Sequence, residues 1–259
     1  MPLEKLTHPP IVEVICGIIF DTLQGMDPLV LGVYWDHRRD EYPQHQILPA
    51  IGAPDLVLGL GGYPPARTWF ISKDDSQVLQ LQSDRFYLNW RKRGGAYPRF
   101  SRTGGLLERG QEEFGRFAEF CRTALGQIPI PRAIELGKTD HFLRGRHFTD
   151  STDLATMIPT LQQALSLTTT ASPEIALHLR EAREGGMLRV GARTVVILGE
   201  GGQREVVLQM ETTINRQVEA PDVAAIARAF TDANEEANRV FDALIPREQR
   251  DRRFQEART

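Results

Sequence analysis

The sequence predicts an α+β fold in which curved antiparallel sheets carry long amphipathic helices. Short runs of alternating apolar and polar residues follow one another with turn residues between them, as in antiparallel strands. Long stretches with the helical apolar period lie apart from these runs. The order strand, helix, several strands, long helix occurs twice along the chain. We therefore expect two similar β-α-β-β-β-α lobes, 1–129 and 130–259, which either stand apart or form one compact domain.

Composition and charge are those of an ordinary globular chain. Of the 259 residues, 41% are hydrophobic and 25% are charged, and the formal net charge is −3. This charge argues against a general polyanion binder, so nucleic-acid binding would depend on a local basic patch. The two cysteines, Cys16 and Cys121, are too few for a disulfide framework and are typical of a reducing compartment. Because no signal peptide and no run of about 18 apolar residues is visible, we expect a cytoplasmic protein with no membrane contact.

A central strand and a short helix are expected near the start of the chain. Both faces of residues 11–20 are mostly apolar, which is typical of a strand with neighbours on both sides. Asp27 as N-cap and Pro28 at the first helical position begin a helix that runs to about residue 40. Its expected buried stripe is Val30, Val33, Tyr34 and Trp35.

The remaining elements follow from the same patterns. Before the middle of the chain we expect irregular structure over 42–54, a loop over 55–66, a strand over 67–72 and a helix over 106–125. After it we expect a strand over 132–142, a helix over 150–165 kinked at Pro159, and a strand over 175–183 with Leu177 and Leu179 inward. The last elements are a hairpin of 193–198 with 205–214 and a helix over 222–244.

The most specific segment is residues 77–93, which read as a β-hairpin with Ser83 and Asp84 as a two-residue turn. Strand side chains alternate between two faces, so this hairpin has an apolar and a polar face. The apolar face carries Leu79, Leu81, Phe86, Leu88 and Trp90. The polar face carries Gln80, Gln82, Arg85, Tyr87, Asn89 and Arg91. A shift of the register by one residue would exchange the two faces.

Two interpretations of this polar face are open. The simpler one is a solvated face, because antiparallel sheets often expose one side to water. The other is a hydrogen-bonding surface for an anionic or amide-rich partner. Residues 85–102 favour the second, because they contain no acid and interleave basic and aromatic residues, a pattern that suits phosphate contact and base stacking. The basic residues are Arg85, Arg91, Lys92, Arg93, Arg99 and Arg102, and the interleaved aromatic residues are Trp90, Tyr97 and Phe100.

Glu13 is the acidic residue that we add to this candidate binding site. It lies in an otherwise apolar strand, and a buried carboxylate must be either paired or protonated. We expect an arginine of the hairpin's polar face to be its partner. Two roles are open for Glu13, a structural salt bridge and a functional acid.

Signatures of several chemistries are missing from the sequence. The chain has no P-loop, no dinucleotide-binding glycine pattern, no nucleophile elbow and no HExxH motif. The glycine-rich segments 59–62 and 199–202 read as turns. His141 and His147 lie six residues apart, which on one strand would separate them by about 20 Å, too far for one metal ion. They could converge only if Gly145 marks a tight turn. We predict no catalytic residue, no metal site and no cofactor.

Several segments together resemble a known protein family. They are PPIVEVICGIIF from Pro9, the pair Tyr42 and Pro43, RTWFIS from Arg67, LQLQSDRFYLNWRK from Leu79, YPRF from Tyr97, and ANRVFDALIPREQRDRRF near the C-terminal end. The chain resembles a sporadically distributed bacterial family of unknown function with a PPIVEV-type start and a QxQxDRFxxNWR central motif. The resemblance implies no activity. Its patchy distribution suggests mobile loci, such as antiviral defence or toxin–antitoxin cassettes.

The sequence thus supports one main hypothesis and two alternatives. The main hypothesis is a non-enzymatic protein that binds a partner or ligand through Glu13 and the hairpin's polar face, as a subunit of a complex. Its partner is a protein or a second copy of the chain. One alternative is a hydrolase or nuclease that acts on a phosphate-containing ligand at the same residues. The other is a nucleic-acid-binding module that uses the basic stretch 85–102, and a strong dependence on salt would distinguish it.

Overall fold

The computed structural model of the chain describes residue 6 and residues 9–51, 66–94, 97–166, 175–199 and 202–254. The predicted loop 55–66 therefore lies almost wholly outside the described residues. The strands are β1 (Ile11–Phe20), β2 (Gln44–Pro49), β3 (Ala66–Ile71), β4 (Gln77–Gln82), β5 (Arg85–Arg91), β6 (Pro131–Leu143), β7 (Ala176–Arg183), β8 (Gly186–Leu198) and β9 (Arg204–Gln217). The helices are α1 (Pro28–Arg38), α2 (Leu106–Leu125), α3 (Ser151–Met157), the 3₁₀ turn η2 (Pro159–Leu161), α4 (Gln162–Ser166), α5 (Val223–Leu244) and α6 (Arg247–Phe254).

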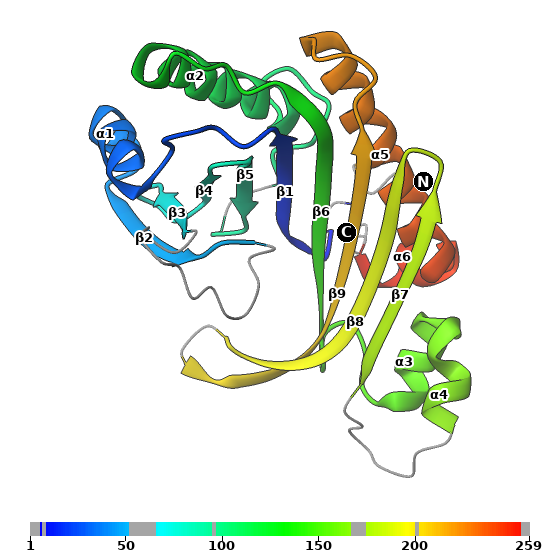
Figure 1. Cartoon of the computed structure of the whole chain (residues 1–259). Coiled ribbons are helices and arrows are strands. Elements are labelled where there is room, and N and C mark those ends of the chain that lie inside the picture. Colours follow the sequence, from blue (N-terminus) through cyan, green and yellow to red (C-terminus); the bar gives the residue numbers. More distant parts are fainter. Residues whose placement is uncertain are drawn as a thin grey trace, which may run out of the picture. The chain divides into compact units, whose positions relative to one another are not determined.

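These strands form one open antiparallel sheet, and the α+β class with antiparallel strands is confirmed (Figure 1). The strand order is β2-β3-β4-β5-β1-β6-β9-β8-β7, so β2 and β7 are its edge strands. As predicted, β1 is a central strand, with β5 and β6 as neighbours. No helix in the described part of the chain is long and apolar enough to cross a membrane.

The chain divides into two compact units. Unit 1 comprises Met1–Val12, Gly137–Ile214 and Asp232–Thr259, and unit 2 comprises Glu13–Leu136 and Asn215–Thr231. Strands β1, β6 and β9 and helix α5 contribute residues to both units. Each unit takes residues from both predicted lobes, and the similarity of the lobes 1–129 and 130–259 stays a prediction.

In unit 2, helix α2 packs against the apolar face of the hairpin β4–β5, and helix α1 packs against β3 and α2. Asp27 caps α1 as predicted, since its carboxylate accepts hydrogen bonds from the backbone N–H groups of Leu29 and Val30. Helix α2 ends at Gly126 in the left-handed conformation, which favours glycine. The core between helices and sheet is aromatic: the rings of Phe86 and Phe117 lie 5.7 Å apart. The predicted apolar face is buried throughout: Leu79, Leu81, Phe86, Leu88 and Trp90.

The register of the hairpin is the predicted one. Gln82 lies opposite Arg85, and Gln80 lies opposite Tyr87. The turn is Ser83 and Asp84, between β4 and β5. The two faces of the hairpin therefore carry the predicted residues.

Unit 1 has its own hydrophobic core beneath α5 and α6. Phe142 of β6, Phe241 of α5 and Phe254 of α6 are buried in it, together with residues of α3 and α4. Arg253 of α6 forms an ion pair with Asp153 of α3, with 2.5 Å between Nη2 and Oδ1. These contacts fix the short helices and the C-terminal helix of the unit to one another.

Four sequence predictions about these elements are wrong in detail. The stretch 42–54 contains β2, because an edge strand tolerates Pro49, which lacks an N–H donor. Helix α1 buries Leu31, Tyr34 and Arg38, so Tyr34 of the predicted stripe is buried, whereas Val30 and Trp35 are half-buried and Val33 is exposed. A salt bridge buries Arg38, and an apolar pattern cannot reveal such a contact.

The other two differences lie in unit 1. The predicted helix 150–165 breaks at Ile158, because Pro159 forces the residue before it out of the helical conformation. Leu177 and Leu179 of β7 were expected to point inward, yet they are 40% and 50% exposed. Strand β7 is an edge strand in which all eight side chains are exposed.

Candidate functional site

The polar face of the hairpin is largely buried, so the solvated-face interpretation is wrong for its centre. Gln80, Gln82, Tyr87 and Asn89 are at most 7% exposed. The two terminal arginines, Arg85 and Arg91, keep partial access, with side chains 22% and 17% exposed. Buried amides must form hydrogen bonds, and their partners define the site.

A chain of side-chain hydrogen bonds crosses four neighbouring strands of unit 2. Asn89 of β5 donates to Glu13 of β1, with 2.8 Å between Nδ2 and Oε1. Gln80 of β4 donates to Asn89 across 2.7 Å, and Arg67 of β3 donates through Nη1 to Gln80 Oε1 at 3.0 Å. The two amides thereby connect an acidic residue on β1 to a basic residue on β3. Their orientations are fixed because each amide both donates and accepts.

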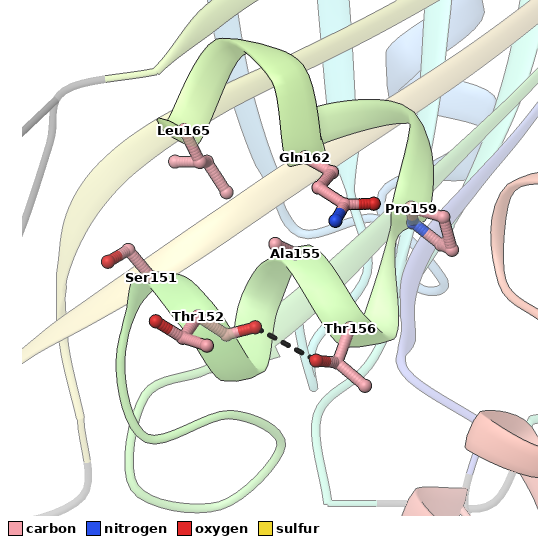
Figure 2. A pocket seen from close by; sticks show the side chains of 7 residues that line it. All are labelled: Ser151, Thr152, Ala155, Thr156, Pro159, Gln162 and Leu165. Atoms are coloured by element: carbon pink, nitrogen blue, oxygen red, sulfur yellow. Dashed lines mark hydrogen bonds between the residues drawn. The ribbon is translucent and has the colours of Figure 1, made fainter. Parts of the chain in front are cut away.

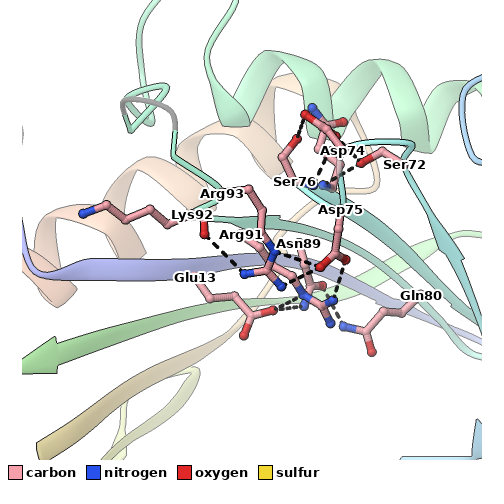
Figure 3. Close-up of polar contacts among 11 residues, drawn as sticks. Glu13, Ser72, Asp74, Asp75, Ser76, Gln80, Asn89, Arg91, Lys92 and Arg93 are labelled. Carbon is pink, nitrogen blue, oxygen red and sulfur yellow. Dashed lines mark hydrogen bonds and ion pairs between the residues drawn. The ribbon is translucent and has the colours of Figure 1, made fainter. Parts of the chain in front are cut away.

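Glu13 has the arginine partner that the sequence predicted (Figure 3). Its register partner on β5 is Arg91, and the Nε of Arg91 lies 3.4 Å from Glu13 Oε1. Arg91 also donates to Asp75 at 3.1 Å, and Asp75 in turn pairs with Arg93. Asp75 lies in the turn before β4 with a φ of 55°. Both arginines at this end of the face therefore have carboxylate partners.

At the other end of the face, Arg85 is also neutralised. Its Nε lies 3.4 Å from Asp84 Oδ2 in the hairpin turn. Gln82 donates to the same carboxylate, with 2.7 Å between Nε2 and Oδ1. The backbone N–H of Ile51 donates to Gln82 Oε1 at 2.8 Å, so the end of the segment after β2 lies across Gln82.

Tyr87 occupies the centre of the face above a glycine of the neighbouring strand. Gly17 is its register partner, and a Cβ atom at Gly17 would lie 2.3 Å from Tyr87 Cε1. Only glycine therefore leaves room for this ring. Burial, with Glu135 nearby, raises the pKa of the Tyr87 phenol to about 12. The hydroxyl consequently stays protonated at neutral pH and accepts a long hydrogen bond from Arg85 Nη1 at 3.4 Å.

Arg67 is the exception among the arginines of this face. Within the described residues its guanidinium contacts the amide of Gln80 and the ring of Trp69, and no carboxylate. Its Nε is buried and has no hydrogen-bond acceptor among those residues. Burial lowers the pKa of Arg67 because the charged form is desolvated. A partly buried cation without a counter-ion is energetically unfavourable, so it indicates a place where an anion would bind.

Trp69 lies beside this unpaired cation. Its ring centroid is 5.3 Å from the Cζ atom of Arg67 and 4.9 Å from that of Arg91, distances at which a guanidinium is attracted to an indole. The indole Nε1 is buried and has no acceptor in the described part of the chain. Two unsatisfied N–H donors, Arg67 Nε and Trp69 Nε1, thus belong to neighbouring side chains of one strand face. We call Arg67 and Trp69 the β3 corner.

The structure brings together all the residues that the sequence singled out. Glu13, Gln80, Arg85, Tyr87, Asn89 and Arg91 lie on the same face of unit 2, with Gln82 at its edge. The β3 corner was missed, although 67–72 was predicted as a strand. Alternation places Arg67 and Trp69 on one face, and Trp69 pairs with Gln80. Pairing the predicted strand 67–72 with β4 would have shown that the polar face continues to Arg67 and Trp69.

The aromatic residues that suggested base stacking have another role. Trp90 is 6% exposed and Phe100 is fully buried, so both belong to the hydrophobic core. Phe100 packs near Phe230 of α5 within the same unit, with 6.4 Å between ring centroids. The stretch 85–102 therefore offers far fewer stacking surfaces than its sequence suggests.

A hollow lies in unit 1, between α3 and α4 (Figure 2). Its volume is about 440 Å³. The hollow is lined by Ser151, Thr152, Ala155, Thr156, Pro159, Gln162 and Leu165. None of these seven side chains is charged, and the hydroxyl of Thr156 is already bonded to the carbonyl of Thr152. None of these seven residues has a buried side-chain polar atom without a hydrogen-bond partner, whereas Arg67 and Trp69 of the β3 corner each have one.

The surroundings of the two cysteines and of His147 indicate structural roles. Both cysteines are buried, and burial raises the pKa of the Cys121 thiol to about 12. His147 accepts a hydrogen bond from the backbone N–H of Leu143 and packs against Phe254. Across the described ranges, no three His, Cys, Asp or Glu side chains are placed to hold one metal ion.

Comparison with known proteins gives no further guide to this site. No family model, no curated protein and no solved structure matches the chain. The resemblance based on the PPIVEV start and the central motif accordingly stays a prediction.

Proposed function

We propose that the chain is a non-enzymatic binding protein whose polar sheet face holds an acidic side chain of a partner protein. The observation that supports this most directly is Arg67. Arg85, Arg91 and Arg93 each have a carboxylate within 3.4 Å, whereas Arg67 has none among the described residues. An incoming carboxylate would supply the missing negative charge at the one arginine of this face that lacks it.

The donors of the β3 corner suit a planar carboxylate. The Nη1 atom of Arg67 is held by Gln80, so the rest of the guanidinium is fixed in orientation. The Nε and Nη2 atoms share one edge of a guanidinium, and that edge binds the two oxygens of a carboxylate in parallel. The indole N–H of Trp69 supplies a further donor next to it. A preformed set of donors lowers the entropic cost of binding.

A protein partner fits this arrangement better than nucleic acid. Neutralising a phosphate backbone takes a run of uncompensated cations. Among the arginines of this face, Arg67 alone has no carboxylate partner within the described residues. The net charge of −3 also opposes a polyanion. The nucleic-acid alternative therefore has fewer exposed stacking residues and fewer uncompensated cations on this face than the sequence suggested.

The face also lacks the groups of a hydrolase. Its side chains are amides, arginines and a phenol whose pKa is about 12, none of which acts as a general base near neutral pH. The one carboxylate of the bonded chain, Glu13, is held by both Asn89 and Arg91. A nucleophile next to a base is missing from this set, and binding remains the function that its geometry supports.

Calorimetric titration with defined probes tests the proposal. The probes are hexaglutamate, hexalysine and a 12-nucleotide single-stranded DNA, at 0.15 M salt. We expect hexaglutamate to bind and hexalysine not to bind. Arg67→Gln should weaken hexaglutamate binding by about ten- to a hundredfold, as expected for the loss of a charge-assisted hydrogen bond.

Two variants serve as controls in this titration. Arg93→Gln makes the same charge change at an exposed arginine that already pairs with Asp75, and it should bind hexaglutamate like the native chain. Asp55 is the one acid in 52–65, outside the described residues, and Asp55→Asn should also bind like the native chain. Equal losses in Arg67→Gln and Arg93→Gln, a gain in Asp55→Asn, or tighter binding of the DNA would each contradict the proposal.

A further inference from the structure

Glu135 of β6 is a half-buried acid on the opposite side of the polar face from Arg67. Its Oε2 accepts a hydrogen bond from Asn215 Nδ2 of β9 at 3.2 Å, and the hydroxyl of Tyr87 donates to the same carboxylate. Within the described residues, Glu135 therefore has an amide and a phenol as partners, and no cation. An ionised carboxylate accepts about four hydrogen bonds, so this one has capacity for an incoming ammonium or guanidinium group.

Glu135 and Trp69 lie at the two ends of a row of residues that crosses five strands of unit 2. From β3 to β5 the row consists of Trp69, Gln80 and Tyr87. On β1 it continues at Gly17, where a Cβ atom would lie 3.3 Å from the Cβ of Glu135 on β6. Neighbouring strands lie about 4.8 Å apart, so four strand spacings separate the ends of the row by about 19 Å.

The two ends of this row carry opposite charges that the described residues do not neutralise. At one end Arg67, in the β3 corner beside Trp69, has no carboxylate partner among those residues. At the other end Glu135 has no cation among them. A partner that complements both ends carries a negative and a positive group about 19 Å apart. A polyanion or a polycation would instead bring like charges together at one end, which is unfavourable.

We propose that the partner places on this face an extended segment with an acidic residue and, six positions along, a basic residue that binds Glu135. The inference rests on the proposed function, because the acidic residue is the one that the β3 corner holds. An extended chain rises about 3.3 Å per residue, so six positions span about 20 Å, close to the length of the row. An even separation also places both side chains on the same side of the segment. Two positions would span only about 7 Å and leave the basic group far from Glu135.

Calorimetric titration of the full chain with three seven-residue peptides, blocked at both ends, tests the inference at 0.15 M salt. The first peptide, Glu-Ser-Gly-Ser-Gly-Ser-Lys, carries the acid and the base six positions apart. The second has Gln in place of Lys, and the third carries Lys two positions from the acid, as Glu-Ser-Lys-Ser-Gly-Ser-Gln. We expect the first peptide to bind about three- to tenfold more tightly than either of the others, as for one added ion pair at a half-buried site.

Two variants locate the effect. Glu135→Gln should abolish the preference for the first peptide, whereas Glu119→Gln, at an exposed position of α2, should retain it. A preference that persists in Glu135→Gln would overturn the inference.

The peptides also test the inference on the native chain, without any variant. Equal binding of the first and second peptides would overturn the role of Glu135, and equal binding of the first and third would overturn the spacing. Either result would leave the proposed function intact, provided that the second peptide and hexaglutamate bind. Failure of hexaglutamate and of all three peptides to bind would contradict the proposed function and this inference together.

Discussion

Arg38 and Arg67 are two arginines of unit 2 that differ in how their charges are neutralised. Arg38 on α1 is buried between α1 and α2, where its Nη1 and Nη2 atoms donate to Glu113 at 2.7 and 3.0 Å. It also pairs with Glu41 at 3.0 Å and lies over the ring of Tyr42. Arg67 on β3 has an amide and an indole but no carboxylate within the described residues.

The charge of Arg38 is neutralised within the fold, whereas the charge of Arg67 has no carboxylate partner among the described residues. In the ion pair of Arg38 with Glu113 the two charges neutralise each other, and the pair links α1 to α2. It therefore needs no ligand. Arg67 is half-buried, its Nε is buried without an acceptor in the described part of the chain, and no carboxylate there neutralises its charge. Arg38, which has a counter-ion within the fold, therefore contributes to stability, whereas we propose that Arg67, which has none among the described residues, serves recognition.

Breaking the Arg38 pair should have the largest effect on stability. Glu113→Gln leaves the buried guanidinium with only the more exposed Glu41, and removing one partner of a buried ion pair costs about 3–5 kcal/mol. Denaturant unfolding should show this loss. Glu119→Gln is the control: its exposed pair with Arg122 should contribute less than about 1 kcal/mol. Equal losses of unfolding free energy in both variants would show that the buried Arg38–Glu113 pair contributes no more to stability than an exposed pair.

Asp140 is the acidic counterpart of Arg67, in unit 1. It is fully buried, its Oδ1 has no hydrogen-bond partner among the described residues, and burial raises its pKa from 3.8 to about 7. The folded chain then binds a proton more tightly than the unfolded chain, so this contribution to stability is present at acidic pH and is lost as pH rises toward 7. Between pH 5 and pH 8 the free energy of unfolding should fall by about 2–3 kcal/mol because of this residue.

Asp140→Asn should remove that pH dependence, measured as unfolding free energies at the two pH values. Asp74→Asn should leave it unchanged, because hydrogen bonds from Ser76 and Ser72 lower the pKa of Asp74 to about 2, below the range tested. A native chain equally stable at pH 5 and pH 8 would contradict the conclusion that burial raises the pKa of Asp140 despite the nearby Lys138.

A substitution of Gly17 tests whether the polar face is tightly packed around Tyr87. Gly17→Ala would place a methyl group against the Tyr87 ring and should destabilise the fold by about 1–3 kcal/mol through overpacking. Gly115→Ala is the matched control, since Gly115 lies exposed within α2 with no atom near its added Cβ. That variant should be more stable by about 0.5–1 kcal/mol. The two melting temperatures should therefore move in opposite directions.

The sequence was sufficient for the parts of the site that depend on local pattern. Alternation and the turn at Ser83 and Asp84 predicted both faces of the hairpin, and an acid in an apolar strand predicted that Glu13 would pair with an arginine. The β3 corner depends on which strand pairs with β4, and Asp75 enters through a turn of positive φ. Such long-range pairing is set by the whole fold rather than by local periodicity.

The dependence on partners that are distant in the sequence also explains why the burial of some residues was predicted wrongly. Leu177 and Leu179 alternate like core residues, but β7 is at the edge of the sheet and leaves them exposed. Arg38 lies in an apolar helix stripe because Glu113 reaches it from a helix 75 residues away. In both cases the sequence pattern is regular, and the partner that decides burial is distant in the chain.

Unfolding of the chain with and without hexaglutamate tests the central claim most directly. A ligand that binds only the folded state at a hundred times its dissociation constant stabilises it by about 2.7 kcal/mol. The native chain and Glu113→Gln should both gain this amount, although Glu113→Gln begins less stable. Arg67→Gln should begin about as stable as the native chain and gain little. Equal stabilisation of native and Arg67→Gln chains by the peptide would contradict the claim that Arg67 is the available charge.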